Sequence, residues 1–378
     1  MSNNRRIKIL FTIPNFDTAG SGIHLFSIAK ILDKNIFNVE IACKHDRGIF
    51  FQVVKNTGIK IHFIDLYKKS RPIKTMLFEC YKLAKQFKKI NPDIIHSYHY
   101  LADYTEPIAA RMAGIKWVYT KKNMSWEGPS YRAWRLRSFI ANGIIAQNSD
   151  MMQLFFHRYK EVKLIPMGIN VNDYEKQSLN QEIVKQWSIN AETRIIMTVA
   201  NMVPVKGIEI LIKVFENISH RYKNWKLIIV GNDSTDYAIG LKEYVQNKSH
   251  LINKIIFTGE QKNVSELLSL AEIYVQPTLD IGRKEGGPIA TLEAMANGKV
   301  ILGSNISGIR DQLLNKFPDH LFSAGDINEL EAKLEKFMSK SKAENENIGG
   351  KFLNYVKKEF DISIQKMKTE EFYLNLIK

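Results

Sequence analysis

Short apolar runs rich in isoleucine and valine alternate along this chain with longer stretches of helical period, and this alternation constrains the fold more than any other feature. In chain order the runs are IKILFTI, FNVEIAC, IKIHFI, DIIHSY, KWVYT, GIIAQN, VKLIPMG, RIIMTVAN, KLIIVGN, IIFTGE, EIYVQPT and KVILGSN. Apolar strands separated by helices are typical of parallel sheets that are covered by helices on both faces. The pattern therefore predicts an α/β protein made of two doubly wound, Rossmann-like halves.

The boundary between the halves is predicted within residues 164–175, LIPMGINVNDYE, where a strand ends in proline and glycine and a polar stretch follows. This gives an N-terminal domain at residues 1–168 and a C-terminal domain at residues 169–360. The last residues, 361–378, have helical character, and we expect this helix to pack back on the N-terminal domain. Two such halves joined by a linker are expected to leave a cleft between them, a usual place for a ligand.

The composition indicates a globular, intracellular protein. The chain is 45% hydrophobic and 25% charged, and its two cysteines, Cys43 and Cys80, are too few for a disulfide framework. No uninterrupted apolar run approaches the roughly 18 residues of a membrane-spanning helix. The first apolar run ends at Pro14 without a small-residue cleavage site, which favours a strand over a signal peptide. We expect a reduced, cytoplasmic compartment.

The net charge of +15 belongs to the N-terminal half. Residues 1–180 carry 28 Lys and Arg against 14 Asp and Glu, whereas residues 181–378 carry 26 against 25. Such asymmetry is typical of proteins that face an anionic membrane or nucleic acid. Residues 67–90 predict a basic amphipathic helix whose apolar face is expected to hold Ile73, Leu77, Tyr81, Ala84 and Phe87. Such a helix either packs on a core with its lysines in solvent or lies on an anionic bilayer.

A glycine-containing turn near the N-terminus, in PNFDTAGSGIHLF, follows a strand and opens a helix. Gly20 and Gly22 allow backbone amides to approach a phosphate at the helix N-terminus. The third glycine of a dinucleotide fingerprint is missing, because Leu25 stands in its place. The alternative is a tight turn with no ligand.

A second loop, in VANMVPVKGIEILIKVF, also joins a strand to a helix. Lys206 and Gly207 place a cation and free amides at the mouth of the helix, which suits a diphosphate. The glycine and hydroxyl spacing of a Walker A loop is absent. A solvated lysine is the alternative.

A third segment, RKEGGPIATLEAMANG, holds two acids on either side of a helix start. Gly286, Gly287 and Pro288 exclude a helix through Glu285, and proline suits the first position of a helix. Glu293 then lies within the helix, at the edge of its apolar face. A half-buried carboxylate needs hydrogen-bond donors, which sugar hydroxyls, backbone amides or a lysine would supply.

Together these segments resemble the retaining, nucleotide-sugar-dependent glycosyltransferases of family 4, which have the GT-B fold. The resemblance lies in the spacing of Glu285 and Glu293, the following AMANGKVILGSNISG, the upstream VANMVPVKG and the N-terminal TAGSG. It spans most of the chain and is strongest over residues 194–311. It implies a hexosyl- or N-acetylhexosaminyl-transferase of cell-surface polysaccharide or glycolipid synthesis, with a UDP-sugar favoured over a GDP-sugar as donor.

The resemblance also implies roles for single residues. Glu285 would contact the donor sugar as a catalytic residue, Glu293 would hold the ribose hydroxyls, and Lys206 would neutralise the diphosphate. The remaining expected donor-binding positions are Gly20, Gly22, Asn201, Gly207, Gly286 and Gly287.

Asn201 departs from the family pattern, which commonly has an arginine five residues before the lysine. A second cation would then come from elsewhere, for instance from Arg283 or Lys284. The Asp-any-Asp pair of many metal-dependent transferases is absent from the sequence. We therefore expect no essential metal and no other cofactor.

The family's histidine near the reacting sugar has two candidates here, His96 and His99, while the commoner family spacing points to Tyr98. We prefer His99 as the catalytic residue, because His96 is expected to end a buried strand. Weaker candidates for the acceptor side are Asp103, Lys121 and Lys122. The expected acceptor is a glycan or a lipid-linked hydroxyl at the inner face of the membrane.

Two other functions are alternatives. A nucleotide-sugar epimerase of the same architecture would use the same donor, and a basic nucleic-acid-binding protein would explain the pI near 9.5. No recognised nucleic-acid-binding module is present in the sequence, so we expect no nucleic-acid partner.

Overall fold

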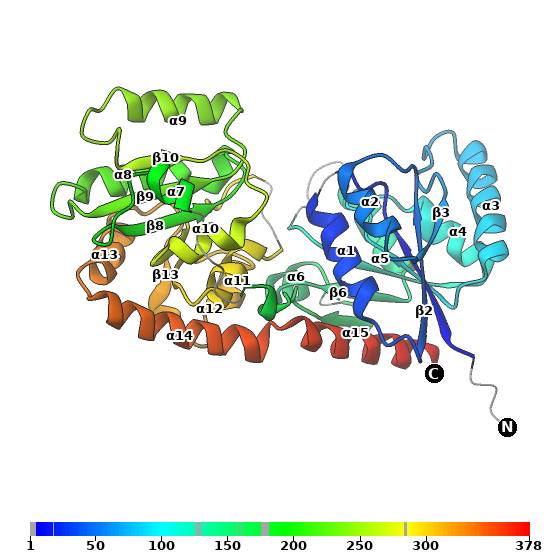
Figure 1. Ribbon diagram of the computed structural model, residues 1–378. Helices are drawn as coiled ribbons and strands as arrows, with labels where there is room; N and C mark the ends of the chain where they lie inside the picture. The colour runs from blue at the N-terminus through cyan, green and yellow to red at the C-terminus, as the bar shows by residue number, and fades with distance from the viewer. Residues whose placement is uncertain are drawn as a thin grey trace. The chain divides into compact units, whose positions relative to one another are not determined.

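The computed structural model describes residues 5–17, 19–124, 126, 130–156, 158–159, 161–174, 181–282 and 286–378. The chain forms two compact units, and Figure 1 labels many of their helices and strands. The first unit consists of Met1–Met167 together with Ser363–Lys378, and the second of Gly168–Ile362. The chain therefore passes from one unit to the other twice.

The described residues of the first unit form a parallel sheet of seven strands in the order β3-β2-β1-β4-β5-β6-β7. The strands are β1 (Ile7–Thr12), β2 (Phe37–Cys43), β3 (Lys60–Phe63), β4 (Ile94–Ser97), β5 (Lys116–Lys121), β6 (Gly143–Ala146) and β7 (Val162–Leu164). Ile9 pairs with Val39 on one side and with Ile94 on the other. The strand order changes direction between β1 and β4, so the loops after these two strands meet at the carboxyl edge of the sheet, the usual ligand position of such folds.

Helices cover both faces of this sheet. They are α1 (Ala19–Ile31), α2 (Ile49–Lys55), α3 (Ile73–Ile90), α4 (Thr105–Ala113), α5 (Tyr131–Ile140) and α6 (Ser149–Leu154), with α15 (Ile362–Ile377) from the end of the chain. One core cluster joins a face of the sheet, through Leu10, Ile95 and Trp117, to the helices α3, α4 and α5. These three helices therefore form a layer on that face.

The last helix, α15, completes the first unit. Gly143 at the start of β6 makes room for it, because a Cβ atom there would lie 2.6 Å from Cζ of Phe372. The ammonium group of Lys116 donates to the carbonyl of Leu376. On the strand side, His96 is fully buried between the hydroxyls of Tyr373, at 2.5 Å, and Thr120, at 2.8 Å.

Helix α3 buries a different stripe from the one that the sequence predicted. Its buried residues are Met76, Cys80, Leu83, Ala84 and Phe87. The predicted core residues Ile73, Leu77 and Tyr81 are 51%, 43% and 52% exposed. The helix is turned in this way because it packs against α4, whose small Ala109 and Ala110 belong to the same core cluster.

The described residues of the second unit form a parallel sheet of six strands in the order β10-β9-β8-β11-β12-β13. The strands are β8 (Arg194–Val199), β9 (Trp225–Val230), β10 (Ile255–Phe257), β11 (Ile273–Gln276), β12 (Val300–Ser304) and β13 (Leu321–Phe322). The order changes direction between β8 and β11. Short turns are η2 (Val171–Tyr174), η3 (Pro204–Lys206) and η4 (Pro318–His320).

The helices of the second unit are α7 (Gln181–Gln186), α8 (Ile208–Ile218), α9 (Asp236–Gln246), α10 (Val264–Leu270), α11 (Ile289–Ala296), α12 (Ile309–Leu313), α13 (Ile327–Met338) and α14 (Lys342–Glu359). Two core clusters, one on each face of the sheet, join the strands to these helices. The predicted fold class, two doubly wound parallel sheets, is confirmed. The sequence missed β13, because two residues are too few to show a strand pattern. No helix in the described parts of the chain has the length and hydrophobicity needed to cross a membrane.

Candidate active site

The loops after β8 and β11 meet at the carboxyl edge of the second sheet. The backbone amide of Leu279 donates to the carbonyl of Val205 at 2.8 Å. Gly207 has φ +64°, and a Cβ atom there would lie 2.0 Å from the carbonyl oxygen of Pro277. Both the left-handed backbone and this close approach require glycine. The contact fixes Lys206 beside the loop that follows β11.

Lys206 ends the short turn η3 and stands directly before α8. Its amide donates to Val203 at 2.9 Å, and its side chain is partly exposed. The N-cap of α8 is Gly207, which has no side chain to bond the first-turn amides. A cation and the positive end of a helix therefore lie together where the strand order changes direction, an arrangement that favours an anion. Asn201 is exposed in the same loop.

The glycine pair after β11 packs against the loop after β12. A Cβ atom on Gly308, which has φ +83°, would lie 2.7 Å from the carbonyl oxygen of Gly286. Gly287 is partly exposed, and a Cβ atom there would meet only Nε2 of Gln312, at 3.7 Å. The predicted catalytic residue Glu285 lies outside the described residues, as do the alternative cations at positions 283 and 284.

Glu293 lies in the middle of α11, as predicted, with most of its side chain buried. The hydroxyl of Tyr174 donates to its Oε1 at 2.8 Å. Burial raises the pKa of the Glu293 carboxyl, and the bond from Tyr174 lowers it in part. The sequence did not indicate a tyrosine as a hydrogen-bond donor to Glu293, because Tyr174 is 119 positions away from Glu293 in the chain.

In the first unit, Gly20 and Gly22 both lie in the first turn of α1. A Cβ atom on Gly22 would lie 2.8 Å from Cδ1 of Phe16 and 3.4 Å from Cδ1 of Phe50. Gly22 therefore allows the β1–α1 loop to fold back on the helix. This turn follows β1 at the carboxyl edge of the sheet, at the point where the strand order changes direction.

His99 follows β4 at the same edge and is buried. Its Nδ1 accepts from the amide of Leu101 at 3.2 Å, so the neutral ring carries its proton on Nε2. Burial lowers the pKa of His99 to about 3, and the cation of Arg137 adds to this shift. The ring stacks on Tyr67 and Tyr100. His99 is therefore a neutral hydrogen-bond donor, whereas both ring nitrogens of His96 are bonded inside the core.

The weaker candidates Asp103, Lys121 and Lys122 make structural contacts. Asp103 accepts from the amide of Thr105 at 3.0 Å and from its hydroxyl at 2.7 Å, which fixes the start of α4. The ammonium group of Lys121 is buried 3.8 Å from the ring centre of Trp134 and donates to Asn123. Lys122 donates to the carbonyl of Tyr98 at 2.6 Å.

A buried ion network below His99 was missed by the sequence reasoning. Arg137 donates to the carbonyls of Leu101 and Asp103 from one nitrogen, and to the carbonyl of His99 and the hydroxyl of Ser97 from the other, at 2.8 to 3.3 Å. Ser97 also donates to Glu106 at 2.8 Å. Arg137 thus holds the whole loop that carries His99.

Glu106 closes this network from α4. It is fully buried and accepts from Thr12 on β1 at 2.5 Å as well as from Ser97 on β4. Burial raises its pKa, and the cation of Arg137 lowers it in part. The carboxylate therefore ties together the two strands between which the order changes direction. Among the described residues, no group of three His, Cys, Asp or Glu side chains is placed to hold a metal ion.

Comparison with known protein families covers both units. The family model described as Glycosyltransferase Family 4 matches residues 18–173, and the one described as Glycosyl transferases group 1 matches residues 180–350. The chain is a family 4-like glycosyltransferase with the GT-B fold. The predictions of the family and of an enzyme are thereby confirmed.

Named relatives of this glycosyltransferase align over much of its length. The capsular polysaccharide biosynthesis glycosyltransferase CapH of Staphylococcus aureus is 23% identical over 98% of this chain and 99% of its own. A UDP-Gal:α-D-GlcNAc-diphosphoundecaprenol α-1,3-galactosyltransferase of Escherichia coli is 24% identical over 82% of each chain. An N-acetyl-α-D-glucosaminyl L-malate synthase of Bacillus anthracis is 26% identical, and the alignment spans 65% of each chain.

Solved structures share the fold of this glycosyltransferase. A glycosyltransferase from Rickettsia africae has a TM-score of 0.84 at 17% identity, covering 99% of both chains. Anabaena HepE in complex with UDP has a TM-score of 0.81 at 19% identity, covering 98% of this chain and 100% of that one. At these identities the likeness is one of fold.

Proposed function

We propose that this glycosyltransferase transfers a sugar, with retention of configuration, from a UDP-sugar to a hydroxyl of a lipid-linked glycan, without an essential metal. The observation that carries the proposal is the close contact between the loops after β8 and β11, where Gly207 packs against the carbonyl of Pro277. It sets Lys206 and the N-terminus of α8 at the carboxyl edge of the second sheet.

Sugar transfer from a nucleotide needs a stabilised leaving group. As the bond to the anomeric carbon breaks, negative charge grows on the diphosphate and positive charge on the sugar ring. Lys206 and the first-turn amides of α8 are placed to stabilise the diphosphate. In this proposal they take the part that a metal ion plays in other transferases, and Glu285 contacts the sugar.

Glu293 is assigned to the ribose hydroxyls of the donor. One of its carboxylate oxygens accepts from Tyr174, and a carboxylate has lone pairs for further donors. A ribose hydroxyl would donate a second hydrogen bond to this carboxylate, which burial has deprived of water as a donor. On the acceptor side, the proposal gives His99 the role of a neutral donor to the reacting sugar.

Related proteins support the choice of donor and acceptor. HepE has been crystallised with UDP and with UDP-glucose. The E. coli relative is named for UDP-galactose as its donor and a diphosphoundecaprenol-linked sugar as its acceptor, and CapH is named for capsular polysaccharide biosynthesis. For this chain we propose a role in cell-surface polysaccharide or glycolipid synthesis, in the cytoplasm at the inner face of the membrane.

A thermal-shift screen with UDP- and GDP-sugars tests the donor. A ligand at a hundredfold excess over its Kd stabilises the folded state by about 2.7 kcal/mol, so a UDP-sugar is expected to raise the Tm by several degrees. Lys206→Ala should remove most of this shift. Lys213→Ala, which changes an exposed lysine on α8, is the matched control and should keep it.

NMR of the reaction tests the chemistry. The proposal expects the released nucleotide to be UDP and the new linkage to keep the anomeric configuration of the donor, with a rate that EDTA leaves unchanged. A free, epimerised UDP-sugar formed without acceptor would instead identify an epimerase. If no sugar nucleotide shifts the Tm and none is consumed, the proposal is wrong.

A further inference from the structure

The helices α3, α4 and α5 carry an uneven distribution of exposed charge. Within these three helices, which the structure describes in full, the exposed charged residues are Lys74, Lys82, Lys85, Lys88, Lys89, Arg111, Arg132 and Arg135. The acids of the three helices are Glu79, which pairs with Lys82 at 2.9 Å, and Glu106, which is buried. The outer surface of this layer is therefore strongly basic.

The same surface exposes large apolar side chains. They are Ile73, Leu77, Phe78, Tyr81, Met112, Tyr131, Leu136 and Phe139. Phe139 is 75% exposed and Phe78 57%. Apolar groups gathered in this way on a surface mark a site of interaction.

The apolar and basic groups of α3 are interleaved. At about 100° per residue, Phe78 lies on the side of the helix opposite to the buried Phe87, so it points away from the core. The ammonium of Lys82 lies 4.4 Å from the ring centre of Phe78, and that of Lys85 lies 4.7 Å from the ring of Tyr81. Long cationic side chains beside rings can reach toward headgroups while the rings enter the apolar layer below.

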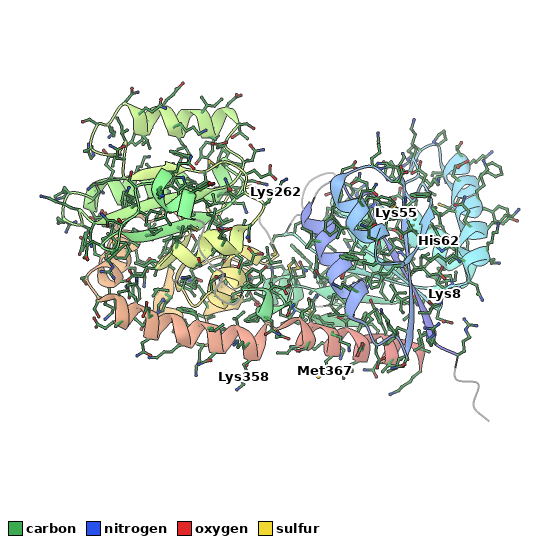
Figure 2. The ribbon with its side chains drawn as sticks, in the orientation of Figure 1. Lys8, Lys55, His62, Lys262, Lys358 and Met367 are labelled. Carbon is green, nitrogen blue, oxygen red and sulfur yellow. The ribbon has the colours of Figure 1, made fainter. Side chains whose placement is uncertain are left out.

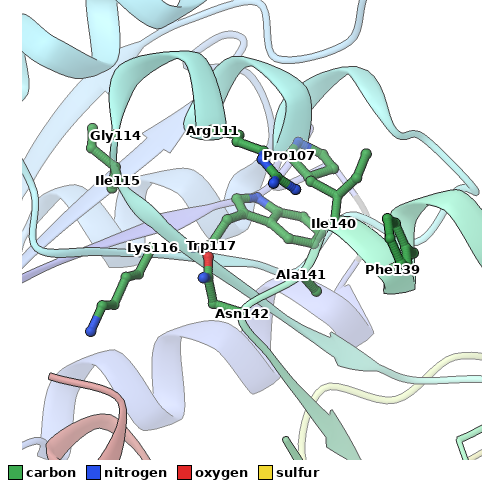
Figure 3. A pocket seen from close by; sticks show the side chains of 10 residues that line it. All are labelled: Pro107, Arg111, Gly114, Ile115, Lys116, Trp117, Phe139, Ile140, Ala141 and Asn142. Carbon is green, nitrogen blue, oxygen red and sulfur yellow. Dashed lines mark hydrogen bonds between the residues drawn. The ribbon is translucent and has the colours of Figure 1, made fainter. Parts of the chain in front are cut away.

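A hollow between the C-terminal turns of α4 and α5 opens on the same layer. Its volume is about 380 Å³, and Figure 3 shows Arg111, Trp117 and Phe139 among the side chains that line it. The exposed guanidinium of Arg111 would favour an anionic group in this hollow.

We propose that the α3–α4–α5 surface docks on an anionic lipid bilayer. The lysines and arginines face the headgroup phosphates, and Phe78 and Phe139 enter the interfacial layer. The inference rests on the proposed function in one respect, since a lipid-linked acceptor requires the enzyme at a bilayer. Exposed aliphatic side chains such as Leu77 and Leu136 favour a bilayer over nucleic acid, because they gain free energy from acyl chains and none from a phosphodiester backbone.

Sedimentation with vesicles tests the proposal on the full-length protein. We expect binding to vesicles of phosphatidylcholine with phosphatidylglycerol, weak binding to phosphatidylcholine alone, and loss of affinity with added salt. Each lysine near an anionic surface contributes about 1 kcal/mol, so the triple variant Lys82→Gln, Lys85→Gln, Lys89→Gln should bind about 100-fold more weakly. The double variant Phe78→Ser, Phe139→Ser should bind the vesicles about tenfold more weakly, with an unchanged dependence on salt.

The matched control changes three exposed lysines of α14, Lys351→Gln, Lys357→Gln and Lys358→Gln; Figure 2 labels Lys358. This variant has the same net charge as the α3 variant and should bind like the parent. Equal losses in both triple variants, or unchanged binding of the double phenylalanine variant, would overturn the proposal. The second outcome would indicate a surface for a polyanion such as nucleic acid.

The Tm shift with a UDP-sugar, measured on the same variants, separates this inference from the proposed function. Variants that keep the shift but lose vesicle binding support the docking surface. A parent that binds vesicles in this way and no sugar nucleotide would contradict the proposed function and leave the docking surface standing. A parent that binds the donor but no vesicles would contradict the docking surface and leave the proposed function standing.

Discussion

The hydroxyl of Tyr174 donates a hydrogen bond of 2.8 Å to Oε1 of Glu293, joining the turn η2 to the helix α11. Tyr174→Phe leaves this buried carboxylate with one donor fewer, which should lower the free energy of unfolding by about 1–3 kcal/mol at pH 8. Urea unfolding measures this change. Tyr237→Phe is the control, because that hydroxyl lies 3.4 Å from Glu209 and its loss should cost less.

The pH dependence of the same variant has a definite sign. The pKa of Glu293 is raised in the folded protein, so its contribution to stability is present below the unfolded pKa of about 4.3 and is lost as the pH rises through the folded pKa. Tyr174→Phe raises that pKa further. The variant should therefore differ most from the parent at pH 8 and least near pH 4, and an equal difference at both would contradict the assignment.

Gly207→Ala tests the contact that fixes Lys206. The new Cβ would lie 2.0 Å from the carbonyl of Pro277 at a φ of +64°, so the two loops must separate. We expect a Tm lower by several degrees and loss of the UDP-sugar shift. Gly240→Ala, in the middle of α9 with no atom within 4 Å of the new Cβ, should instead stabilise the protein by about 0.5–1 kcal/mol.

The buried histidines should make the first unit sensitive to acid. Burial lowers the pKa values of His24, His96 and His99 to about 3. The contribution of these neutral histidines to the stability of the folded protein is therefore fully present above the unfolded pKa of about 6.5 and is lost as the pH falls below it. Each should reduce the free energy of unfolding by about 1.4 kcal/mol per pH unit between about pH 6 and pH 4. Urea unfolding across this range measures the slope.

Replacing one of these histidines should reduce by one the number of protons taken up on unfolding, and so reduce the slope. His99→Asn removes one of the three titrations, and its slope should be smaller by about 1.4 kcal/mol per pH unit. His220→Gln, at an exposed position, should leave the slope as it is. Equal slopes for the parent and His99→Asn would show that His99 is not held neutral.

The Arg137–Glu106 network predicts strong coupling. Arg137→Met leaves Glu106 buried without its cation, which should cost about 3–5 kcal/mol. In the double variant Arg137→Met, Glu106→Gln the amide can still bond Thr12 and Ser97, so the part of the loss that comes from the uncompensated charge should be recovered. The four hydrogen bonds that Arg137 donates are lost in both variants. A double-mutant cycle by urea unfolding measures the coupling, and simple additivity of the two single variants would contradict it.

The repeating strands and helices were predictable because each leaves its own local pattern. Every apolar run identified in the sequence forms a strand, and Gly298, two residues past the end of α11, has the left-handed backbone that is typical of a glycine at a helix C-terminus, with φ +66°. The two-residue β13 leaves no such pattern. The prediction of the buried face of α3 was wrong, because the orientation of this helix depends on its packing against α4. The sequence of α3 alone does not encode that packing.

The candidate site was predictable where it depends on loops after strands and not where it depends on distant partners. Lys206, Gly207 and Glu293 lie in the predicted kinds of loop and helix. Arg137 and Glu106 were missed, because a polar residue in an amphipathic helix looks alike whether it meets solvent or a buried hydrogen-bond network. Tyr174 was missed because it is 119 positions away from Glu293 in the chain. Only the fold brings Thr12 of β1, Ser97 of β4 and Glu106 of α4 together.

The position of α15 has a consequence for how the protein is made. The second unit is one uninterrupted segment, whereas the first needs Ser363–Lys378, which are translated after the whole of the second unit. His96 has no Tyr373, and Lys116 no Leu376, until α15 has been synthesised. Because domains generally fold as units as they emerge, the unit translated second should be the first to reach its final form, while the first unit waits for α15.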